Sequence, residues 1–362
     1  MLPRILPTLA LALVIGQADG FDATRWTILD PAGKAMPYLG APSIFLDNGI
    51  ALLRDSAFGD GTIEFDVAMH GHPSFAGILF RAESPSDYEL VYLRPHRSRQ
   101  WDALQYTPIF NGSEAWQLYS GEGYTAAAEL PANRWVHVRL VVEGHTARLY
   151  VDRAAEPQLV IPHLKRPWGR GQVGLWGRLG GANFTNVVVT PASTTPPAAG
   201  QEPAPTPGVL TAWELSQVWD AAKVSPRSLP DPRAAGTVDW KAVTSEPSGL
   251  LNIARYRQPM VARQANPAKD SRDVVFARTI ITSAQARRVR LLFGYSDAVH
   301  LFLNGRLLFE AENRFRSRDP GFLGVISLGP DAIYLDLVAG RNELVFAVSE
   351  TFGGWGLAAR IE

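Results

Sequence analysis

Residues 86–119 collect the side chains of this sequence that are best suited to recognising a ligand. Tyrosine, tryptophan, arginine, histidine and amide side chains are concentrated there among alternating apolar residues. Sugar rings stack their C–H faces on Trp and Tyr, and their hydroxyls pair with Arg, Asn and Gln. The stretch therefore predicts a carbohydrate-binding surface, and its candidate ligand-binding residues are Tyr92, Arg94, His96, Gln105, Tyr106, Asn111 and Trp116.

Three of these residues have the spacing of one strand face. Tyr92, Arg94 and His96 lie at positions i, i+2 and i+4, so an extended backbone points all three the same way. Gln105 and Tyr106 are adjacent, so a regular strand points them to opposite faces unless a bulge intervenes. Charged side chains rarely lie on a core face, which favours a binding site. Ordinary sandwich packing is the alternative, because aromatic residues also favour strands.

The rest of the chain supplies short segments with the two-residue period of β-strands. In residues 61–70, for example, Ile63, Phe65 and Val67 alternate with polar residues. Asn304-Gly305, between two such segments, is typical of a type I′ hairpin turn. Only residues 211–222 favour a short helix. The pattern predicts an all-β fold class with two β-sandwich (jelly-roll) domains.

A segment rich in Pro, Ala and Thr divides the chain. Residues 191–208 show no apolar periodicity and are typical of an extended linker. A length of 362 residues also suggests two domains. We therefore predict one sandwich over residues 21–190 and a second over residues 209–362, joined by this Pro-rich linker.

The first twenty residues have the pattern of a signal peptide. Arg4 precedes an apolar run over residues 6–15, and small residues follow at 16–18. Residues 1–20 therefore predict a secreted or periplasmic protein, with a buried N-terminal strand or helix as the alternative. No later segment has ~18 consecutive apolar residues, so we expect no membrane insertion once the signal is removed.

The composition excludes several classes of function. Lys and Arg total 35 and Asp and Glu total 35, so the chain has no net charge with which to attract nucleic acid. The sequence has no cysteine, which excludes disulfides, thiolate nucleophiles, cysteine-ligated zinc and iron–sulfur clusters.

Two sets of motifs carry resemblances to known families. The first set is GTIEFDV (61–67), FAGILFR (75–81), YELVYLR (88–94), WVHVR (135–139), LYVD (149–152) and GLW (174–176). In this order the motifs resemble a concanavalin A-like lectin/glucanase domain of the laminin-G-like or 3-keto-disaccharide-hydrolase-like branch. The resemblance covers residues 60–190 and implies two curved antiparallel sheets, with any ligand on the concave face or at the loop rim.

The second set is AVHLFLNG (298–305), AGRNELVFA (339–347) and GWGL (354–357). These motifs resemble galactose-binding-like jelly rolls over residues 272–362. Modules of that family accompany many secreted glycosidases, and in many of them the jelly roll is only structural.

The carboxylates do not select a catalytic mechanism. The laminarinase-type branch of the resembled family carries Glu-x-Asp-x-x-Glu, and Glu64 and Asp66 match its start. Met69 occupies the third position, so the carboxylate pair of a retaining glycosidase is incomplete. No spacing rule selects another pair among Glu83, Asp87, Glu89, Asp102 and Glu114.

No complete metal site is evident. His70 and His72 have the spacing of two metal ligands, but a third ligand is not evident and exposed loop histidines are the simpler interpretation. Lectin-like sandwiches often hold calcium at the rim, and Asp55, Asp60 and Asp152 are available for a structural calcium. We predict no cofactor and leave the metal site unassigned.

Together these observations predict a secreted carbohydrate-binding protein that recognises a glycan, or another polar small molecule, on the concave face of its first sandwich, without catalysis. The first alternative is a glycoside or keto-sugar hydrolase that uses carboxylates near the same face. The second is a structural or protein-interaction module whose aromatic residues meet another protein.

Overall fold

The computed structural model describes residues 22–192, 204–230, 238–260, 273–329 and 331–362. The described residues form antiparallel strands in four sheets and three short 3-10 turns, which are η1 (Ala23–Arg25), η2 (Pro95–Arg97) and η3 (Ile253–Arg255). The predicted all-β fold class is confirmed. No helix in this part of the chain is long and apolar enough to cross a membrane.

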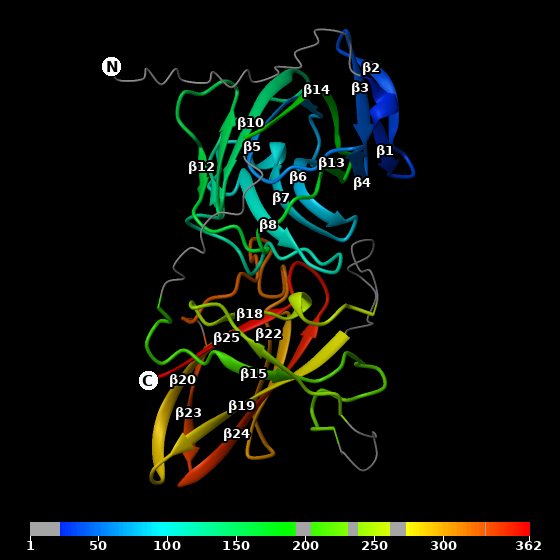
Figure 1. The fold of residues 1–362 in the computed structure, drawn as a ribbon. Helices are drawn as coiled ribbons and strands as arrows, with labels where there is room; N and C mark the ends of the chain where they lie inside the picture. Colours follow the sequence, from blue (N-terminus) through cyan, green and yellow to red (C-terminus); the bar gives the residue numbers. More distant parts are fainter. Residues whose placement is uncertain (1–21, 193–203, 231–237, 261–272, 330) are drawn as a thin grey trace, which may run out of the picture.

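The N-terminal sandwich is built from two sheets of seven strands each (Figure 1). The strands of the first sheet, in spatial order, are β1 (Trp26–Leu29), β4 (Gly49–Leu53), β13 (Gln172–Arg178), β6 (Phe75–Ser84), β7 (Asp87–Leu93), β8 (Leu104–Ile109) and β9 (Thr125–Ala126). Those of the second sheet are β12 (Leu159–Ile161), β11 (Thr146–Val151), β10 (Trp135–Glu143), β5 (Gly61–Met69), β14 (Ala182–Pro191), β3 (Ala41–Leu46) and β2 (Lys34–Tyr38).

Strand alternation places the core between these sheets. On β5, Ile63, Phe65 and Val67 are fully buried while the residues between them point outward. On β7, Val91 and Leu93 join the same core cluster. The sequence period thus correctly predicts which side chains of β5 fill the core.

The outer face of the first sheet is also largely buried. Its apolar cluster consists of Ile50, Leu52, Leu79, Ala82, Tyr88, Leu90, Tyr92, Ile109 and Trp176, with partly buried Phe75 packed against it. An ion pair between Glu114, from the loop after β8, and Arg178, at the end of β13, joins that loop to this sheet. The face is therefore an aromatic surface that the protein itself partly covers.

The C-terminal sandwich packs a larger sheet on a four-stranded one. The larger sheet contains β17 (Lys241–Thr244), β15 (Ala212–Leu215), β19 (Asp273–Ser283), β24 (Gly340–Glu350), β21 (Ala298–Leu303) and β22 (Arg306–Glu312), with β16 (Trp219–Asp220) paired to β19. The smaller sheet contains β18 (Leu250–Asn252), β25 (Gly356–Ile361), β20 (Arg287–Ser296) and β23 (Asp331–Leu337).

The predicted helix over residues 211–222 is wrong. The segment forms β15 and β16, because Trp213 and Leu215 alternate into the core while β17 and β19 bind its backbone on both sides. Pairing with neighbouring strands overrides the weak local preference for helix. Residues 1–21 and 193–203 lie outside the described chain, so the signal peptide and the linker stay predictions, as do the domain boundaries.

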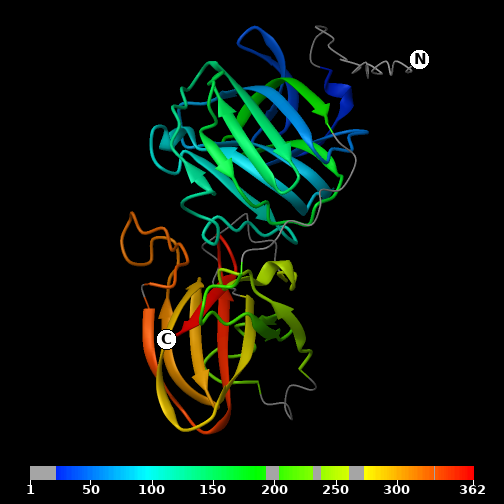
Figure 2. The ribbon, with the colours of Figure 1, turned by 60° about the vertical axis from the view of Figure 1, so that its left-hand side comes forward.

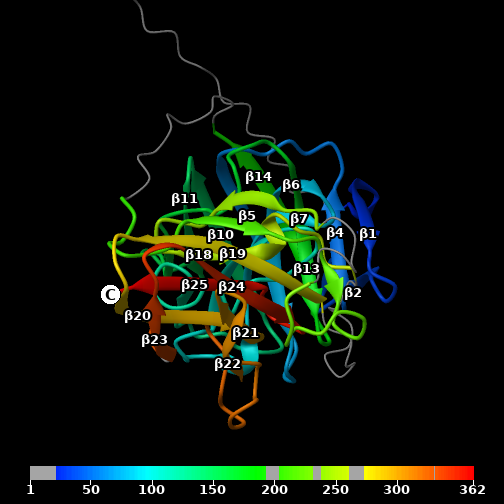
Figure 3. The same cartoon turned by 90° about the horizontal axis from the view of Figure 1, so that it is seen from below.

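The two sandwiches stack end to end, and loops of one meet loops of the other (Figures 1 and 2). Seen along the stack from the C-terminal sandwich, the N-terminal sandwich lies directly behind it (Figure 3). The N-terminal contribution is the loop of residues 110–121, which we call the docking loop. It packs against residues 351–356 and against the loop of residues 313–326, which we call the wall loop. Ala115, Leu118 and Tyr119 form an apolar cluster with Leu250 across this junction.

Candidate ligand-binding site

Arg94 organises the residues next to the end of β7. Its Nη2 donates to the hydroxyl of Tyr92 and to Oε1 of Gln105, both at 2.8 Å. Its Nη1 donates to the carbonyl of Asp102 at 3.0 Å and to its carboxylate at 3.2 Å. The structure thus brings together three of the predicted site residues, Tyr92, Arg94 and Gln105. Because the terminal nitrogens are occupied and the residue is buried, Arg94 positions its neighbours.

The hydroxyl of Tyr92 remains protonated in this network. Burial raises the pKa of Tyr92 to about 12, against the opposing charge of Arg94. The side chain packs against Trp176 with ring centroids 5.3 Å apart and ring planes tilted by 43°, and the Arg94 guanidinium lies 5.1 Å from its ring centroid. The Tyr92 ring is therefore held by Trp176 on one side and by Arg94 on another.

His96 does not lie on the strand that the sequence predicts for it. β7 ends at Leu93, and Pro95 begins the turn η2, so the register of alternate residues stops before His96. The His96 ring is exposed, packs edge-on against Phe75 at 5.1 Å and places Nδ1 3.2 Å from the carbonyl oxygen of Ser74. Burial on that side, helped by Arg94 and Arg97, lowers the pKa of His96.

Tyr106 points away from the other candidates. Strand alternation on β8 sends it into the core between the sheets, where it is fully buried. Its hydroxyl donates to Glu89 at 2.7 Å and accepts the backbone N–H of Lys165 at 2.6 Å. Gln105 and Tyr106 therefore occupy opposite faces, and Tyr106 has no surface to offer a ligand.

Glu89 is a second fully buried group in this part of the core, and burial raises its pKa above the ordinary 4.5. The native state consequently holds a proton that the unfolded chain has lost, so the free energy of unfolding should fall as pH rises from 4.5 through the raised native pKa. Glu89→Gln should remove this part of the pH dependence of the free energy of unfolding, because the amide does not titrate. Urea denaturation from pH 4 to pH 8 should show the variant gaining stability relative to wild type as pH rises.

The difference between wild type and Glu89→Gln reports on Glu89 alone. Burial also raises the pKa of Asp297, but Asp297 is present in both proteins. The amide cannot accept hydrogen bonds from both Tyr106 and Arg166, so a pH-independent loss of about 1–3 kcal/mol is expected in addition. Parallel stability curves for wild type and variant would contradict the assignment. Glu122→Gln, at an exposed carboxylate, serves as the control.

Asn111 and Trp116 face the other sandwich. Asn111 Nδ2 donates to the carbonyl of Ala254 at 2.8 Å. The Trp116 ring lies 5.7 Å from that of Phe315 and 6.0 Å from that of Phe352, and the Arg94 guanidinium lies 5.9 Å from its centroid. These two predicted site residues therefore help to dock the sandwiches.

Gln117 is the central polar contact of the docking loop. The residue is fully buried, its Nε2 donates to the carbonyl of Leu323 at 2.9 Å, and its Oε1 accepts the hydroxyl of Ser296 at 3.1 Å. Its backbone N–H donates to Gly353, and its carbonyl accepts the N–H of Ile326. Gln117 of the N-terminal sandwich thus fixes the position of the wall loop.

A partly buried ion pair at Glu246 secures the same junction. The hydroxyl of Tyr119 donates to Glu246 Oε1 at 2.6 Å, and Nζ of Lys165 lies 2.5 Å from Oε2. Burial and then the charge of Glu246 raise the pKa of Tyr119, so the phenol remains a donor. These contacts, which include the buried hydroxyl of Tyr119, help to hold the two sandwiches in their observed arrangement.

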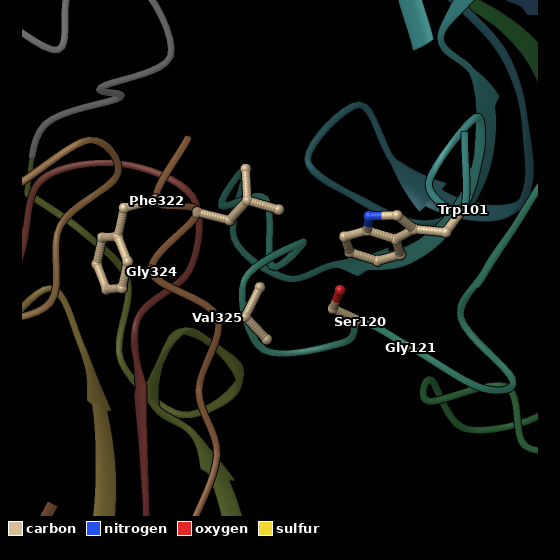
Figure 4. Close-up of a pocket in the computed structure, with 7 residues that line it drawn as sticks. Trp101, Ser120, Gly121, Phe322, Gly324 and Val325 are labelled. Carbon is tan, nitrogen blue, oxygen red and sulfur yellow. The ribbon is translucent and has the colours of Figure 1, made fainter. Parts of the chain in front are cut away.

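A pocket of about 430 Å³ opens between the docking loop and the wall loop, with walls from both sandwiches. Its lining residues are Trp101, Ser120, Gly121, Phe322, Leu323, Gly324 and Val325. Figure 4 shows the indole of Trp101 on one side, the ring of Phe322 on the other, and Ser120 and Val325 between them. Trp101 is 48% exposed, so the pocket presents a large aromatic face to solvent.

The loop that carries Trp101 is held in place by contacts of the residues that follow Trp101. Asp102 is buried and binds Arg94 on one carboxylate oxygen and Arg97, at 2.9 Å, on the other. The backbone N–H of Arg94 also donates to Ala103 at 2.8 Å. An exposed tryptophan on a fixed loop is preorganised to stack on a flat ligand.

The sequence prediction missed this pocket. Trp101 belongs to the aromatic stretch but was not among the seven candidates, and its signal is a tryptophan inside the polar run RSRQWD. Phe322 lies more than two hundred positions away in a polar loop of the other sandwich, where no local pattern marks it.

The carboxylates considered for catalysis are all engaged by neighbours. Glu64 and Asp66 flank His137 on the outer face of the second sheet, at 3.4 Å and 2.9 Å. Glu83 and Asp87 pair with Arg166, Asp102 with two arginines and Glu114 with Arg178, while Glu89 is fully buried. No two of these groups present themselves as a free pair.

The metal-ligand candidates are also placed. His70 and His72 stack with ring planes 4° apart and centroids at 5.5 Å. Asp60 pairs with Arg81 and Asp152 pairs with Arg134. Within the described ranges, no group of three or more His, Asp or Glu side chains is arranged to hold a metal ion.

The known proteins to which this chain is similar are solved structures. No family model matches it, and no curated protein matches it. Among solved structures, a carbohydrate-binding module CBM66 from Bacillus subtilis is 17% identical, covers 46% of this chain and 95% of its own, and gives a TM-score of 0.35.

Two further structures are similar to the same extent. A Bacillus licheniformis β-glucanase is 12% identical over 49% of this chain and 100% of its own, with a TM-score of 0.32. Sheep galectin-11 is 11% identical over 40% of this chain and 97% of its own, with a TM-score of 0.29. All three TM-scores are well below 0.5 and do not support a shared fold. The assignment of the sandwich fold rests on the sheets described above.

Proposed function

We propose that this protein binds carbohydrate without catalysis, and that the binding site is the pocket between the sandwiches. The observation that supports the proposal is the exposure of Trp101. Its side chain is 48% exposed and lines a pocket of about 430 Å³, on a loop that the Asp102–Arg94 contacts hold in place. Phe322 lies opposite, and the Ser120 hydroxyl with the surrounding backbone supplies polar partners (Figure 4). An aromatic platform with a few polar groups suits a sugar ring.

The proposal moves the site from the concave sheet face to its edge. Tyr92, Arg94 and Gln105 support the loop of Trp101. Trp116 packs against Phe315 of the wall loop, and Asn111 binds Ala254 across the junction. Export through a signal at residues 1–20, to the cell exterior or periplasm, is part of the same proposal.

Binding is favoured over hydrolysis by the state of the carboxylates. A two-carboxylate glycosidase needs one group free to act as acid and another as nucleophile or base. In the described part of the chain, the carboxylates of the aromatic stretch are ion-paired or buried, and none lines the pocket. A glycan held here therefore meets no obvious acid–base pair.

Trp101→Ala should lower glycan affinity about tenfold or more, because it removes the aromatic surface on which the sugar ring stacks. A tenfold loss of affinity corresponds to ~1.4 kcal/mol of binding free energy. Affinity electrophoresis of the full chain on a panel of neutral and acidic polysaccharides measures the effect. Tyr334→Ala is the matched control, since Tyr334 is 66% exposed on β23 and does not line the pocket. Equal retention of wild type and Trp101→Ala on every retained polymer would refute the site.

A further inference from the structure

Arg318 is an exposed residue of the wall loop, and its guanidinium packs against a residue that lines the pocket. Its Cζ lies 4.7 Å from the ring centroid of Phe322, which lines the pocket. Its one hydrogen bond within the described residues is a long contact of 3.4 Å to Asn313 Oδ1, and no carboxylate in that part of the chain is within ion-pair distance. Stacking on an aromatic ring fixes the plane of a guanidinium and leaves its N–H edges available.

The neighbouring charges leave that guanidinium available. Arg314 pairs with Glu312, and Arg316 is exposed and packs against Phe315 next to it. Asp319 is adjacent to Arg318, but one oxygen accepts the N–H of Gly321 at 2.7 Å in a local turn. Glu122 is exposed beside the lining residue Gly121. The wall loop thus offers two arginines, at 316 and 318, without a carboxylate partner among the described residues.

Building on the proposed function, we propose that the pocket selects acidic glycans, with the carboxylate of a uronic acid bound by Arg318 while the sugar ring stacks on Trp101. A planar guanidinium binds a carboxylate through two parallel hydrogen bonds, which a neutral hydroxymethyl group cannot match. The aromatic walls provide affinity for the ring, and Arg318 provides the preference for charge. Screening should weaken this preference at high salt.

The test compares polymers whose carboxyl groups are either ionised or methyl-esterified. Polygalacturonate and alginate are each paired with their methyl-esterified form, and binding of the full chain is measured by affinity electrophoresis and calorimetry. Wild type should bind at least one acid form about tenfold more tightly than its ester, and added salt should reduce the difference. Arg318→Ala should abolish the preference, and Arg318→Lys should keep only part of it. Arg306→Ala, at an exposed arginine beside the Asn304-Gly305 turn, should change nothing.

The outcomes separate this inference from the proposed function. If each polymer and its ester bind equally, or if Arg318→Ala retains the preference, selection by Arg318 is refuted. Retention of neutral glycans that still depends on Trp101 would then leave the proposed function standing. If no polymer, neutral or acidic, is retained in a Trp101-dependent way, the proposed function fails and the inference fails with it.

Discussion

Arg94→Ala should destabilise the protein by about 3 kcal/mol, because it leaves buried polar partners uncompensated. Asp102, Tyr92 and Gln105 are each at most 4% exposed, and each binds the Arg94 guanidinium. Urea denaturation monitored by tryptophan fluorescence measures the loss. The loop of Trp101 rests on this network, so glycan affinity should fall even at temperatures where the variant is folded.

Arg97→Ala is the matched control for that experiment. Arg97 binds the same carboxylate of Asp102, but its side chain is 34% exposed, so its loss should cost under about 1 kcal/mol. Arg94→Lys keeps the charge but cannot reach three partners at once, so it should rescue little. Similar stability losses for Arg94→Ala and Arg97→Ala would show that the network is not the support we describe.

Gly353→Ala should disrupt the junction, with a loss of about 2–4 kcal/mol from overpacking and backbone strain together. Gly353 has φ of +101°, and a Cβ there would overlap Oε1 of Gln117 and lie 2.7 Å from its Cδ and 3.0 Å from Cε2 of Trp116. Gln117 cannot move freely, because it is bound to Leu323 and Ser296. Displacing it should shift the wall loop and weaken glycan binding, which thermal denaturation and affinity electrophoresis measure together.

Gly305→Ala separates strain from overlap in this prediction. Gly305 also has a positive φ, +82°, but a Cβ there would meet nothing within 4 Å, so only the strain of about 1–2 kcal/mol applies. In a double-mutant cycle, Gln117→Ala should relieve part of the Gly353→Ala penalty. Additive effects, or equal losses for the two glycine variants, would contradict the described contact.

Local patterns predicted the strands well. The alternation in β5 correctly assigned core and outer faces, since a period of two is set by the backbone itself. The turn at Asn304-Gly305 is confirmed, with φ of +50° and +82° between β21 and β22. These features depend only on residues close in sequence.

The proposed site was harder to predict, because its residues contact partners that are distant in the sequence. Asn111 binds Ala254 and Trp116 packs against Phe352, contacts that no local spacing encodes. The aromatic composition of residues 86–119 therefore had two causes, a supported loop and a docking surface, and the sequence could not separate them. Pro95 was readable as a strand terminator and would have removed His96 from the strand face.

The two-sided pocket also ties ligand binding to the arrangement of the whole molecule. At the proposed site, a glycan between Trp101 and Phe322 would contact both sandwiches at once, so it would bind fully only while they remain docked. By mass action, ligand at a hundred times its dissociation constant would stabilise the docked state by about 2.7 kcal/mol. If the proposed site is occupied in this way, the glycan would act as a structural component of the junction, and its loss would loosen the connection between the two halves of the chain.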